Sequence, residues 1–345
     1  MKKVFLNLLI GIKDITMINN KSIFITGGTG SFGKFFTDHI LKNHKPKKII
    51  IFSRDELKQH EMSQKYGNEK KLRFFLGDVR DQARLEMATE GVDILVHAAA
   101  MKQVPASEYN PMEAINTNIN GAKNIVMASI KNKIKQNILL STDKACSPVN
   151  LYGATKLCAE KIFISAKNLV GAKKLKFSVL RYGNVNGSRG SVMPIFKKNN
   201  IQNKDLNITD ERMTRFSISL QDAIRMVSWG IKNFQGGEIL IPKIPSYKVI
   251  DLANSFKSPK IKISSIRPGE KIHEDLISLS ESQNMIDIGK YYILFNKDNK
   301  KKILNGYKKL KYKIIKKQFN YRSDLNSNFL SKKQLQTIVA KLPND

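Results

Sequence analysis

The sequence predicts an α/β fold in which a mostly parallel sheet is covered by helices on both faces. Short apolar runs rich in β-branched residues alternate along the chain with helical patterns. Some of these runs, such as "KKIIIF" at residues 47–52, have no polar side chain within their apolar part. A strand of this kind needs cover on both of its faces. A chain of 345 residues is long enough to bury the core that such a sheet requires.

The expected strands and helices alternate through the first half of the chain. Strands are expected at residues 22–26, 48–52, 72–76, 93–97, 137–141 and 176–181. Helices are expected at residues 31–42, 56–65, 82–89, 111–132 and 151–169. Parallel strands joined by crossing helices form a doubly wound sheet, which we expect up to about residue 190. Beyond it the pattern is mixed, with a further strand at residues 238–241 and loops rich in Arg, Pro and Gly.

A glycine-rich turn separates the first expected strand from the first expected helix. In "IFITGGTGSFGK", Gly27, Gly30 and Gly33 have the spacing of a dinucleotide-binding turn, and Ser31 and Phe32 lie between them. Glycines allow a tight turn and let a pyrophosphate approach the free N–H groups at the helix N-terminus. The sequence therefore predicts a Rossmann-like first half with these five residues at the cofactor.

The predicted organisation has three parts. Residues 1–16 are interpreted as an N-terminal extension, because they imitate a secretion signal but lack a small-residue cleavage site. Met17 lies directly before the first strand and is an alternative start to Met1. Residues 17–190 form the cofactor-binding Rossmann domain. Residues 191–345 form a smaller C-terminal substrate-binding region, partly interleaved with the first domain.

Composition narrows the classes of partner. The formal net charge is +31, but the Lys residues are spread along the whole chain and no nucleic-acid-binding motif accompanies them, so no nucleic-acid partner is expected. The longest early apolar run, residues 4–12, is too short to cross a membrane. The two cysteines, Cys146 and Cys158, lack metal-binding spacing and favour a reducing compartment. We therefore expect a cytoplasmic protein without a membrane partner or a metal site.

The end of the second expected strand bears on the choice of cofactor. Ser53 and Arg54 come directly after the apolar run, and Lys58 follows one turn later. Two cations suit the 2′-phosphate of NADP, whereas an enzyme that uses NAD usually has a carboxylate here. NADP is therefore the expected cofactor, while Asp55 leaves NAD open.

Further cofactor contacts are expected after the third and fourth strands. Asp78 and Val79 lie where the adenine ring would be flanked. The small side chains of Ala98 and Ala99 allow the backbone to approach the nicotinamide ribose. Lys102 is expected between the cofactor and the substrate.

One helix face carries the residue pair of enzymes that move a hydride. Tyr152 and Lys156 are four residues apart, so they share a face of the expected helix. A free phenol has a pKa near ~10, which the Lys156 ammonium and an oxidised nicotinamide would both lower. We expect Tyr152 to take the proton of a substrate hydroxyl, with Thr142 hydrogen-bonded to the same oxygen. Asp143 and Lys144 follow Thr142 directly, and simple alcohol oxidation does not need them.

These motifs resemble one family along most of the chain. The similar stretches are "TGGTGSFGK", "SRDELKQ", "GDVRD", "HAAAMKQVP", "YNPMEAINTNINGA", "STDKACSPVNLYGATK", "RYGNVNGSRGSV", "MTRF", "IRPGEKIHE" and "FNYRSDLNSNFLSKKQL". Together they resemble the inverting UDP-N-acetylglucosamine 4,6-dehydratases, within the extended short-chain dehydrogenases/reductases. Three positions depart from the family pattern: Gln103 where His is common, Asn186 where the residue is often apolar, and Ser217 where an aromatic is common.

The resemblance implies a reaction that uses the additional acid and base. Oxidation of the sugar at C4 makes the C5 hydrogen acidic, and the C5 proton and C6 hydroxyl are then lost. In this family Asp143 would be the acid and Lys144 the base. The hydride returns to C6 and a proton reaches the opposite face of C5, so a tightly bound NADP acts catalytically. The product would be UDP-2-acetamido-2,6-dideoxy-β-L-arabino-hex-4-ulose, which opens pseudaminic acid synthesis and flagellin glycosylation.

This assignment sets a condition on the two side chains. Asp143 needs a raised pKa and Lys144 a lowered pKa, and burial would shift both pKa values in these directions. A close ion pair would oppose both shifts. We therefore expect the two side chains to point at different substrate atoms.

The second half is expected to bind the diphosphate and nucleoside of UDP-N-acetylglucosamine. Three arginines, Arg212, Arg215 and Arg267, suit a diphosphate. By resemblance, the other substrate contacts would be Asn184 at the sugar-phosphate side, Thr209, and Glu270 at the UDP ribose. The family also implies a homo-oligomer, either a dimer or a hexamer.

Three alternative functions stay open. A related UDP-sugar dehydratase or epimerase of capsule or O-antigen synthesis would use the same residues. A UDP-sugar 4-epimerase would leave Asp143 and Lys144 without a role. A Rossmann protein that only senses NADP commonly lacks the Tyr-Lys pair, which this chain keeps.

Overall fold

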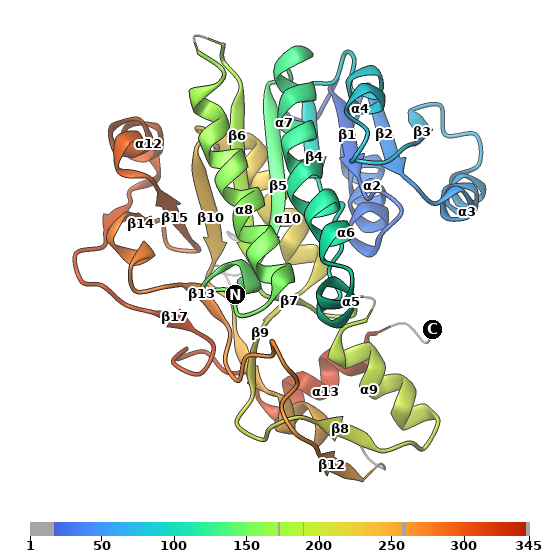
Figure 1. The fold of residues 1–345 in the computed structure, drawn as a ribbon, viewed down its shortest axis with the longest axis vertical. Coiled ribbons are helices and arrows are strands. Elements are labelled where there is room, and N and C mark those ends of the chain that lie inside the picture. The colour runs from blue at the N-terminus through green and yellow to red at the C-terminus, as the bar shows by residue number, and fades with distance from the viewer. Residues whose placement is uncertain (1–16, 172, 189, 257–259, 343–345) are drawn as a thin grey trace, which may run out of the picture.

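The computed structural model describes residues 17–171, 173–188, 190–256 and 260–342 (Figure 1). The predicted extension, residues 1–16, lies outside the described residues and includes Met1, whereas the alternative start, Met17, is described.

A large sheet runs through the described part of the molecule. Its parallel strands are β1 (Ser22–Thr26), β2 (Lys48–Ser53), β3 (Leu72–Leu76), β4 (Ile94–His97), β5 (Gln136–Thr142), β6 (Lys176–Tyr182) and β10 (Glu238–Pro242). Three antiparallel strands extend one edge: β14 (Met285–Asp287), β15 (Tyr291–Phe295) and β16 (Lys313–Ile314). The order across the ten strands is β16-β14-β15-β10-β6-β5-β4-β1-β2-β3. The predicted α/β class with a doubly wound parallel sheet is confirmed.

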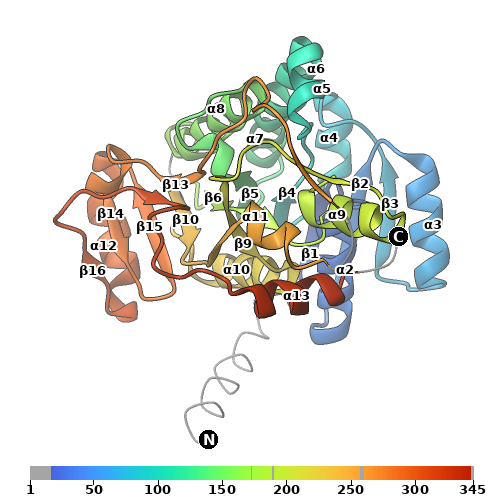
Figure 2. The ribbon, with the colours of Figure 1, turned by 90° about the horizontal axis from the view of Figure 1, so that it is seen from below.

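Helices cover both faces of this sheet, as Figure 2 shows in the view along the strands. On one face lie α4 (Gln82–Ala88), α7 (Gly121–Lys131) and α8 (Leu151–Ser165), and on the other lie α2 (Ser31–Asn43) and α10 (Leu220–Asn233). Two more helices lie at the two edges of the sheet: α3 (Glu56–Tyr66) and α12 (Lys300–Tyr307). Every residue of β1 is buried, as uninterrupted apolar strands require when both faces are covered.

The helix expected at residues 111–132 is interrupted. The segment consists of α6 (Pro111–Ile115), one π-helical turn (Asn116–Asn120) and α7. Asn118 lies in the wider turn, where its side chain pairs with both backbone groups of Met101 and donates to Thr155 Oγ1. These bonds join the segment after β4 to α8, which explains why the helical repeat gives way here. A short helix that the periodicity did not predict, α5 (Val104–Tyr109), precedes α6.

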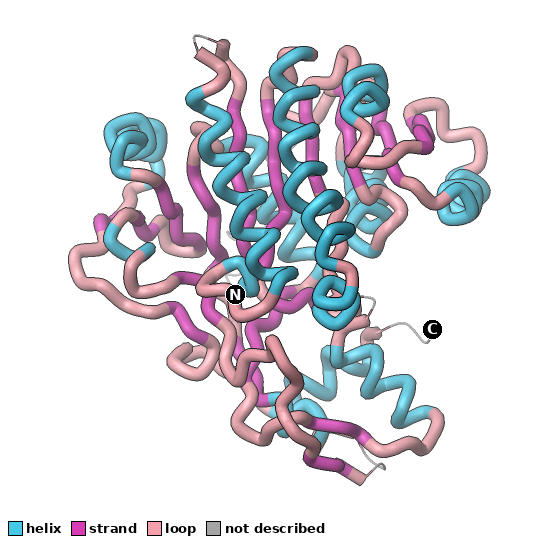
Figure 3. Tube along the Cα trace, viewed as in Figure 1, coloured by secondary structure: helices cyan, strands magenta, loops and turns pink. Residues whose placement is uncertain are grey.

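The chain after residue 190 forms a second, smaller core and also returns to the large sheet. The small region contains α9 (Val192–Ile201), α11 (Val249–Ala253), α13 (Lys332–Ala340) and the strands β7 (Asn184–Val185), β8 (Leu206–Ile208), β9 (Thr214–Ile218), β11 (Ser246–Lys248) and β12 (Ile261–Ile263). A further pair, β13 (Asp275–Ile277) and β17 (Tyr321–Arg322), packs into the core of the large sheet through Leu276, Ile277 and Tyr321. Figure 3 shows how much of this region is loop. Because β10 and β14–β16 belong to the large sheet, residues 191–345 are divided between both regions.

The strand order sets the place of a site. It reverses between β1 and β4, because β2 continues from one side of β1 while β4 lies on the other. In open α/β sheets the connections diverge at this point and leave a crevice at the carboxyl ends of the strands.

Candidate active site

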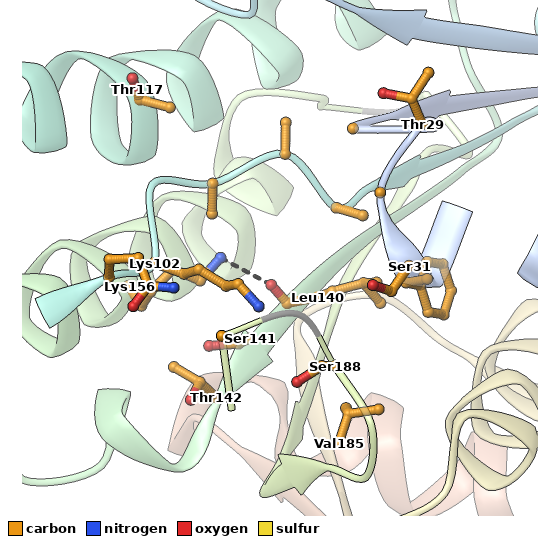
Figure 4. Close-up of a pocket in the computed structure, with 18 of the residues that line it drawn as sticks. Thr29, Ser31, Lys102, Thr117, Leu140, Ser141, Thr142, Lys156, Val185 and Ser188 are labelled. Atoms are coloured by element: carbon orange, nitrogen blue, oxygen red, sulfur yellow. Dashed lines mark hydrogen bonds between the residues drawn. The ribbon is translucent and has the colours of Figure 1, made fainter. Parts of the chain in front are cut away.

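A cavity of about 590 Å³ opens at the carboxyl ends of the parallel strands. Its walls come from the glycine-rich turn, from the ends of β2 to β6, from α8 and from residues 183–185, 188, 190 and 191. Figure 4 shows Thr29 and Ser31 of the turn on one side, facing Lys102, Lys156 and Thr142 across it. The residues predicted to bind the cofactor, from the glycine-rich turn to Lys156, therefore line one continuous cavity.

The glycine-rich turn has the shape that a dinucleotide requires. Gly27 has a φ of +63°, and a Cβ there would lie 2.9 Å from the backbone nitrogen of Ala99. Gly30 is the N-cap of α2, and no side chain caps this helix, so the N–H groups of its first turn face the cavity side of the turn. The turn thus fits a pyrophosphate, whose negative charge these N–H groups would bind.

Most predicted cofactor residues line the cavity. They are Gly27, Gly30, Ser31, Phe32, Ser53, Arg54, Asp55, Lys58, Asp78, Val79, Ala98, Ala99, Lys102, Tyr152 and Lys156. Gly33 is the exception. A Cβ on Gly33 would lie 2.3 Å from the carbonyl oxygen of Gly28, so this glycine lets α2 pack against the turn and does not face the cavity. The prediction that Gly33 contacts the cofactor is therefore corrected.

Charged side chains at the end of β2 form pairs with one another. Asp55 is the N-cap of α3: its side chain accepts from the backbone N–H of Lys58 and is ion-paired with the Lys58 amine. Arg54 lies 3.6 Å from the carboxylate of Asp78, with 59% of its side chain exposed. Burial would raise the pKa of Asp78, but hydrogen bonds from Arg80 hold that pKa below its usual value. The Asp55 carboxylate, which could favour NAD, is thus already bonded to Lys58. The Arg54 guanidinium, in contrast, is largely exposed at the cavity rim.

The end of β4 is held by buried hydrogen bonds. Thr26 Oγ1 lies 2.7 Å from Nδ1 of His97 and accepts from the backbone N–H groups of Ala98 and Ala99. Burial lowers the pKa of His97 to about 3, so this imidazole is neutral and structural. Burial also lowers the pKa of Lys102, which lines the cavity in the next segment.

Tyr152 and Lys156 lie on the face of α8 that meets the cavity. Both are buried, and Lys156 Nζ donates to the carbonyl oxygen of Leu140 at 2.8 Å (Figure 4). Burial raises the pKa of Tyr152 to about 12, although Lys144 and a hydrogen bond with Thr142 act to lower it. Burial lowers the pKa of Lys156 to about 8. The expected lowering of the Tyr152 pKa is therefore wrong for the protein without its cofactor, because burial outweighs the nearby cations.

Asp143 and Lys144 form a single-turn 3₁₀ helix (Asp143–Ala145) after β5, and they form a close ion pair. Lys144 Nζ lies 3.1 Å from Asp143 Oδ1 and 3.0 Å from Oε1 of a second carboxylate, Glu274. Burial alone would lower the pKa of Lys144, but the two carboxylates raise it above its usual value. Burial raises the pKa of Asp143 in spite of the Lys144 ammonium. The raised pKa of Asp143 agrees with its expected role, whereas the expected lowered pKa of Lys144 and the expected separation of the two side chains are wrong.

Close backbone contacts fix the turn of Asp143 and Lys144 against α8. Gly153 lies so near that a Cβ there would be 2.2 Å from the carbonyl oxygen of Lys144. Asn150, the N-cap of α8, accepts from Gly153 N and donates to the carbonyl oxygen of Gly269. Lys271 donates to the carbonyl oxygen of Cys146 at 2.7 Å. The "IRPGEKIHE" segment is therefore bonded to Cys146, at the end of the turn that carries Asp143 and Lys144, and to Asn150, at the start of α8.

The predicted substrate residues are more dispersed. Asn184 lines the main cavity, and its Oδ1 is buried without a hydrogen-bond partner among the described residues. Thr209 and Arg212 line a separate hollow of about 440 Å³ between residues 209–212 and 263–266. Arg212 is paired with Asp210 there, and Arg267 is paired with Glu270 at 3.2 Å.

Arg215 is not at a cavity wall. It is 8% exposed and donates to the backbone carbonyl oxygens of Thr214, Lys271 and Ile272. Its Nε lies 3.8 Å from Glu274. The structure thus gives this guanidinium internal partners in place of the expected open position toward a diphosphate.

Sequence reasoning missed several residues of the site. Glu274, 2% exposed, is the most consequential, and its only sequence signal was its position at the end of "IRPGEKIHE". Tyr182, at the end of β6, faces the cavity with a pKa that burial raises. Other cavity residues without a prediction are Thr29, Thr117, Ser141, Ser188 and Ser191.

Comparison with known proteins identifies the family. A family model described as "Polysaccharide biosynthesis protein" matches residues 23–296. The "UDP-N-acetylglucosamine 4,6-dehydratase (inverting)" of Campylobacter jejuni subsp. jejuni serotype O:23/36 (strain 81-176) is 51% identical over 330 residues, which cover 94% of this chain and 98% of that protein. The chain belongs to this inverting dehydratase family. The resemblance read from its motifs is confirmed.

Further comparisons also find proteins named as nucleotide-sugar enzymes. The "UDP-glucose 4-epimerase" of Rickettsia bellii (strain RML369-C) is 44% identical, with 80% of this chain and 83% of that protein covered. The solved structure of Pen from Bacillus thuringiensis has a TM-score of 0.85 at 33% identity and covers 94% of this chain and 99% of that chain. A structure of DesIV, a dTDP-glucose 4,6-dehydratase from Streptomyces venezuelae with NAD and TYD bound, shares the fold, with a TM-score of 0.66 at 20% identity over 73% of this chain and 86% of that chain.

The three departures from the family pattern have distinct places in this family member. Gln103 lines the cavity. Asn186 and Ser217 meet each other, because Ser217 Oγ donates to Asn186 Oδ1 at 2.8 Å where β7 pairs with β9. A polar pair thus occupies both positions together.

Two searches of the structure concern metals and membranes. Among the described residues, no three His, Cys, Asp or Glu side chains are grouped so that they could hold a metal ion. Within the same part of the chain, no helix has the length and apolar character needed to span a bilayer.

Proposed function

We propose that the protein converts UDP-N-acetylglucosamine into UDP-2-acetamido-2,6-dideoxy-β-L-arabino-hex-4-ulose, the first step of pseudaminic acid synthesis. The observation that carries the proposal is Asp143: a carboxyl group that is 1% exposed, lines the cavity beside Thr142 and Tyr152, and has a raised pKa because of burial. A buried acid at this position suits the loss of a hydroxyl group, which alcohol oxidation alone does not involve.

NADP is the proposed cofactor. The turn at Gly27 and Gly30 would hold the pyrophosphate, and the exposed guanidinium of Arg54 would meet the 2′-phosphate. The pairing of Asp55 with Lys58 supports this choice, because the carboxylate is then less able to accept a ribose hydroxyl. When bound, the nicotinamide accepts a hydride from C4 of the sugar and returns it to C6.

The first proton transfer is assigned to Tyr152. Its phenolate would take the proton of the C4 hydroxyl while Thr142 binds the same oxygen. The high pKa of Tyr152 in the protein alone means that it stays protonated until further positive charge reaches the cavity. The lowered pKa of Lys156, a consequence of burial, leaves this amine able to exchange a proton near neutral pH.

Elimination is assigned to Asp143 and Lys144. The electrons of the C5–H bond form a C5–C6 double bond as the C6–O bond breaks, and Asp143 gives its proton to the departing oxygen, which leaves as water. Lys144 accepts the proton that C5 loses. Since Lys144 is an ammonium in the substrate-free protein, it must release its own proton before it can accept this one. A new proton then reaches C5 on the opposite face, which inverts that centre.

A 4-epimerase is the second candidate, because relatives with that name are 44% identical to the chain. An epimerase oxidises C4 and reduces the same carbon from the other face, so it breaks no bond at C5 or C6. Two observables separate the reactions: only the dehydratase introduces a solvent deuteron at C5, and only the dehydratase removes the C6 oxygen.

The experiment follows UDP-N-acetylglucosamine with the protein in heavy water by NMR. The proposal expects a 4-keto-6-deoxy sugar with inverted C5, one deuteron at C5, and no net consumption of NADPH. Asp143→Asn should retain C4 oxidation but form 6-deoxy product ~10²–10⁴-fold more slowly, as for loss of one positioned acid. Asp287→Asn, which breaks a surface pair with Lys243, is the matched control with unchanged turnover. A C4-epimeric UDP-sugar as the product would establish the epimerase instead.

We also propose the setting in which the enzyme works. The free cysteines Cys146 and Cys158 support a reducing compartment, and the substrate is a cytoplasmic metabolite by its chemistry, so the cytoplasm is the proposed location. A homo-oligomer, dimer or hexamer, is proposed on family grounds, with neither nucleic acid nor membrane as partner.

A further inference from the structure

Glu274 is a buried carboxylate that shares the Lys144 ammonium with Asp143. Its side chain is 3% exposed, and Lys144 Nζ lies 3.0 Å from Glu274 Oε1 and 3.1 Å from Asp143 Oδ1. The second oxygens of both carboxyl groups, Glu274 Oε2 and Asp143 Oδ2, are buried without a hydrogen-bond partner among the described residues. One cation therefore lies between two acids that each keep an unpaired oxygen.

The backbone of Glu274 is anchored by the C-terminal part of the chain. Glu274 N donates to Ser323 Oγ at 2.9 Å, and Ser323 N donates to Glu274 O at 2.8 Å. Ser323 Oγ lies 2.6 Å from Thr214 Oγ1, and all three residues are buried. The "FNYRSDL" segment, which the proposed reaction otherwise leaves without a role, thus holds Glu274 in place.

Charge pairing decides which of the two acids carries a proton. With Glu274 ionised, Lys144 already has a counter-ion, and a second negative charge on Asp143 would lie beside the first in a buried place. Arg215 lies 3.8 Å from Glu274 and not beside Asp143 in any ion pair of the described residues, so the second cation also favours charge on Glu274. Two acids in unequal environments separate into one ionised and one protonated group.

We propose that Glu274 is a positioning residue that binds the Lys144 ammonium and so leaves Asp143 holding the proton needed for elimination. This rests on the proposed dehydratase reaction and assigns to it a residue that is not among those lining the main cavity. The pKa directions agree with the geometry: burial raises the pKa of Asp143 and Glu274 raises it further, while Lys144 and Arg215 outweigh burial to lower the pKa of Glu274.

Titratable and charged groups of other elements also lie around Asp143. None of them provides the second carboxylate that Glu274 offers to Lys144. Two further carboxylates near the pair have cations of their own: Asp275 is paired with Lys271, and Glu270 is paired with Arg267. The remaining titratable and charged groups around the pair are Lys144, Tyr152, Lys156, Arg215, Tyr247 and Lys271.

A substrate-free measurement tests the proposal. Infrared difference spectra between the full-length protein and Asp143→Asn, recorded over a pH series, isolate the protonated-carboxyl band of Asp143. In Glu274→Gln, paired with Glu274→Gln/Asp143→Asn, this band should disappear at a pH about 1 to 2 units lower, as expected when a like charge some ~6 Å away is removed at an effective dielectric constant of ~20. Asp275→Asn, which removes the neighbouring carboxylate, is the matched control and should leave the midpoint unchanged.

A second measurement uses turnover of UDP-N-acetylglucosamine. Formation of the 6-deoxy product should fall with rising pH as Asp143 loses its proton, and in Glu274→Gln this fall should move to lower pH by the same amount. The KM and the rate of C4 oxidation, seen as bound reduced cofactor, should stay within about 3-fold of the unmodified protein, since Glu274 acts through Asp143.

The outcomes separate the two proposals. An unchanged infrared midpoint in Glu274→Gln overturns the role of Glu274, whatever the substrate. If the infrared midpoint shifts but the unmodified protein makes no 6-deoxy product, the positioning role stands and the dehydratase proposal fails. If Glu274→Gln does not fold, Glu274→Asp decides: it keeps the charge, so a midpoint within half a unit supports the role, and a fall of one unit or more contradicts it.

Discussion

The two ends of the active-site cavity are built in different ways. At the cofactor end, the wall consists of backbone at the glycine-rich turn and of side chains at the rim, such as Arg54 with 59% of its side chain exposed. At the elimination end, two buried carboxylates share one cation: Asp143 and Glu274 both bind Lys144, whose side chain is 23% exposed. Behind them, Arg181 is fully buried and binds both Glu160 and Glu281.

This difference indicates how each end should respond to change. A rim cation is solvated, so its loss affects one contact and little else. A buried pair has lost its water, so removal of one partner leaves the other charge without solvation and affects the whole network. Changes at the cofactor end should therefore alter affinity locally, and changes at the elimination end should alter pKa values, rates and stability together.

The largest expected effect lies where the two ends meet, at Tyr152. Tyr152→Phe should slow C4 oxidation by ~10²–10⁴-fold or more, because no other base is assigned to the C4 hydroxyl. The near-ultraviolet absorbance of reduced cofactor after addition of UDP-N-acetylglucosamine measures this step. Tyr109→Phe, at a residue that is 87% exposed, is the matched control. Normal reduction of the cofactor by Tyr152→Phe would mean that the base is a different group.

Substitutions in the buried ion-pair network of Arg181, Glu160 and Glu281 should destabilise the protein. Arg181→Met leaves the carboxylates of Glu160 and Glu281 without their cation, which should lower the free energy of unfolding by about 3–5 kcal/mol. Urea unfolding measures the change. Arg225→Met removes a solvent-exposed pair with Asp222 and should cost at most about 1 kcal/mol. Equal costs for both variants would remove the contrast between buried and exposed pairs.

At the cofactor end, the expected effect is local. Arg54→Asp places a negative charge where the 2′-phosphate of NADP is proposed to bind, so affinity for NADP should fall about 10–100-fold more than affinity for NAD. Fluorescence titration with both cofactors measures the ratio. Arg73→Asp, an exposed cation outside the cavity, controls for net charge and should leave the ratio unchanged. If both affinities fall alike, the cofactor preference is set by another residue.

The smallest expected effect on activity is at Glu238, a buried acid outside the cavity. This acid should alter only how stability depends on pH. Burial raises the pKa of Glu238, at the start of β10, to about 7, against an ordinary value of 4.5. The folded state therefore binds a proton more tightly than the unfolded state, and stability should fall by about 3 kcal/mol as the pH rises from 4.5 to above 7. Urea unfolding at several pH values should show less of this fall in Glu238→Gln, with dehydratase activity unchanged. A pH dependence that survives the substitution belongs to another group.

Local patterns in the sequence were sufficient for the cofactor half. All six strands expected there begin and end within one residue of the observed positions, because uninterrupted apolar runs of this kind fit strands covered on both faces. The glycine spacing and the pair Tyr152–Lys156 are also local, since a turn and a helix face depend on residues close in the chain. These features lead directly to the correct fold and family.

Tertiary structure alone decided the charge state of the elimination end. Glu274 and Asp143 are far apart in the chain, and no periodicity indicates that they share Lys144. The wrong expectations for Lys144 and Tyr152 have one cause: a pKa depends on burial and on charges brought close by folding, which residue type and spacing do not contain. The internal partners of Arg215, the π-helical turn at Asn118 and the return of β10 and β14–β16 to the large sheet are likewise long-range contacts. The sequence by itself determined which chemical groups are present and where the cofactor turn lies, and folding determined which of those groups hold protons.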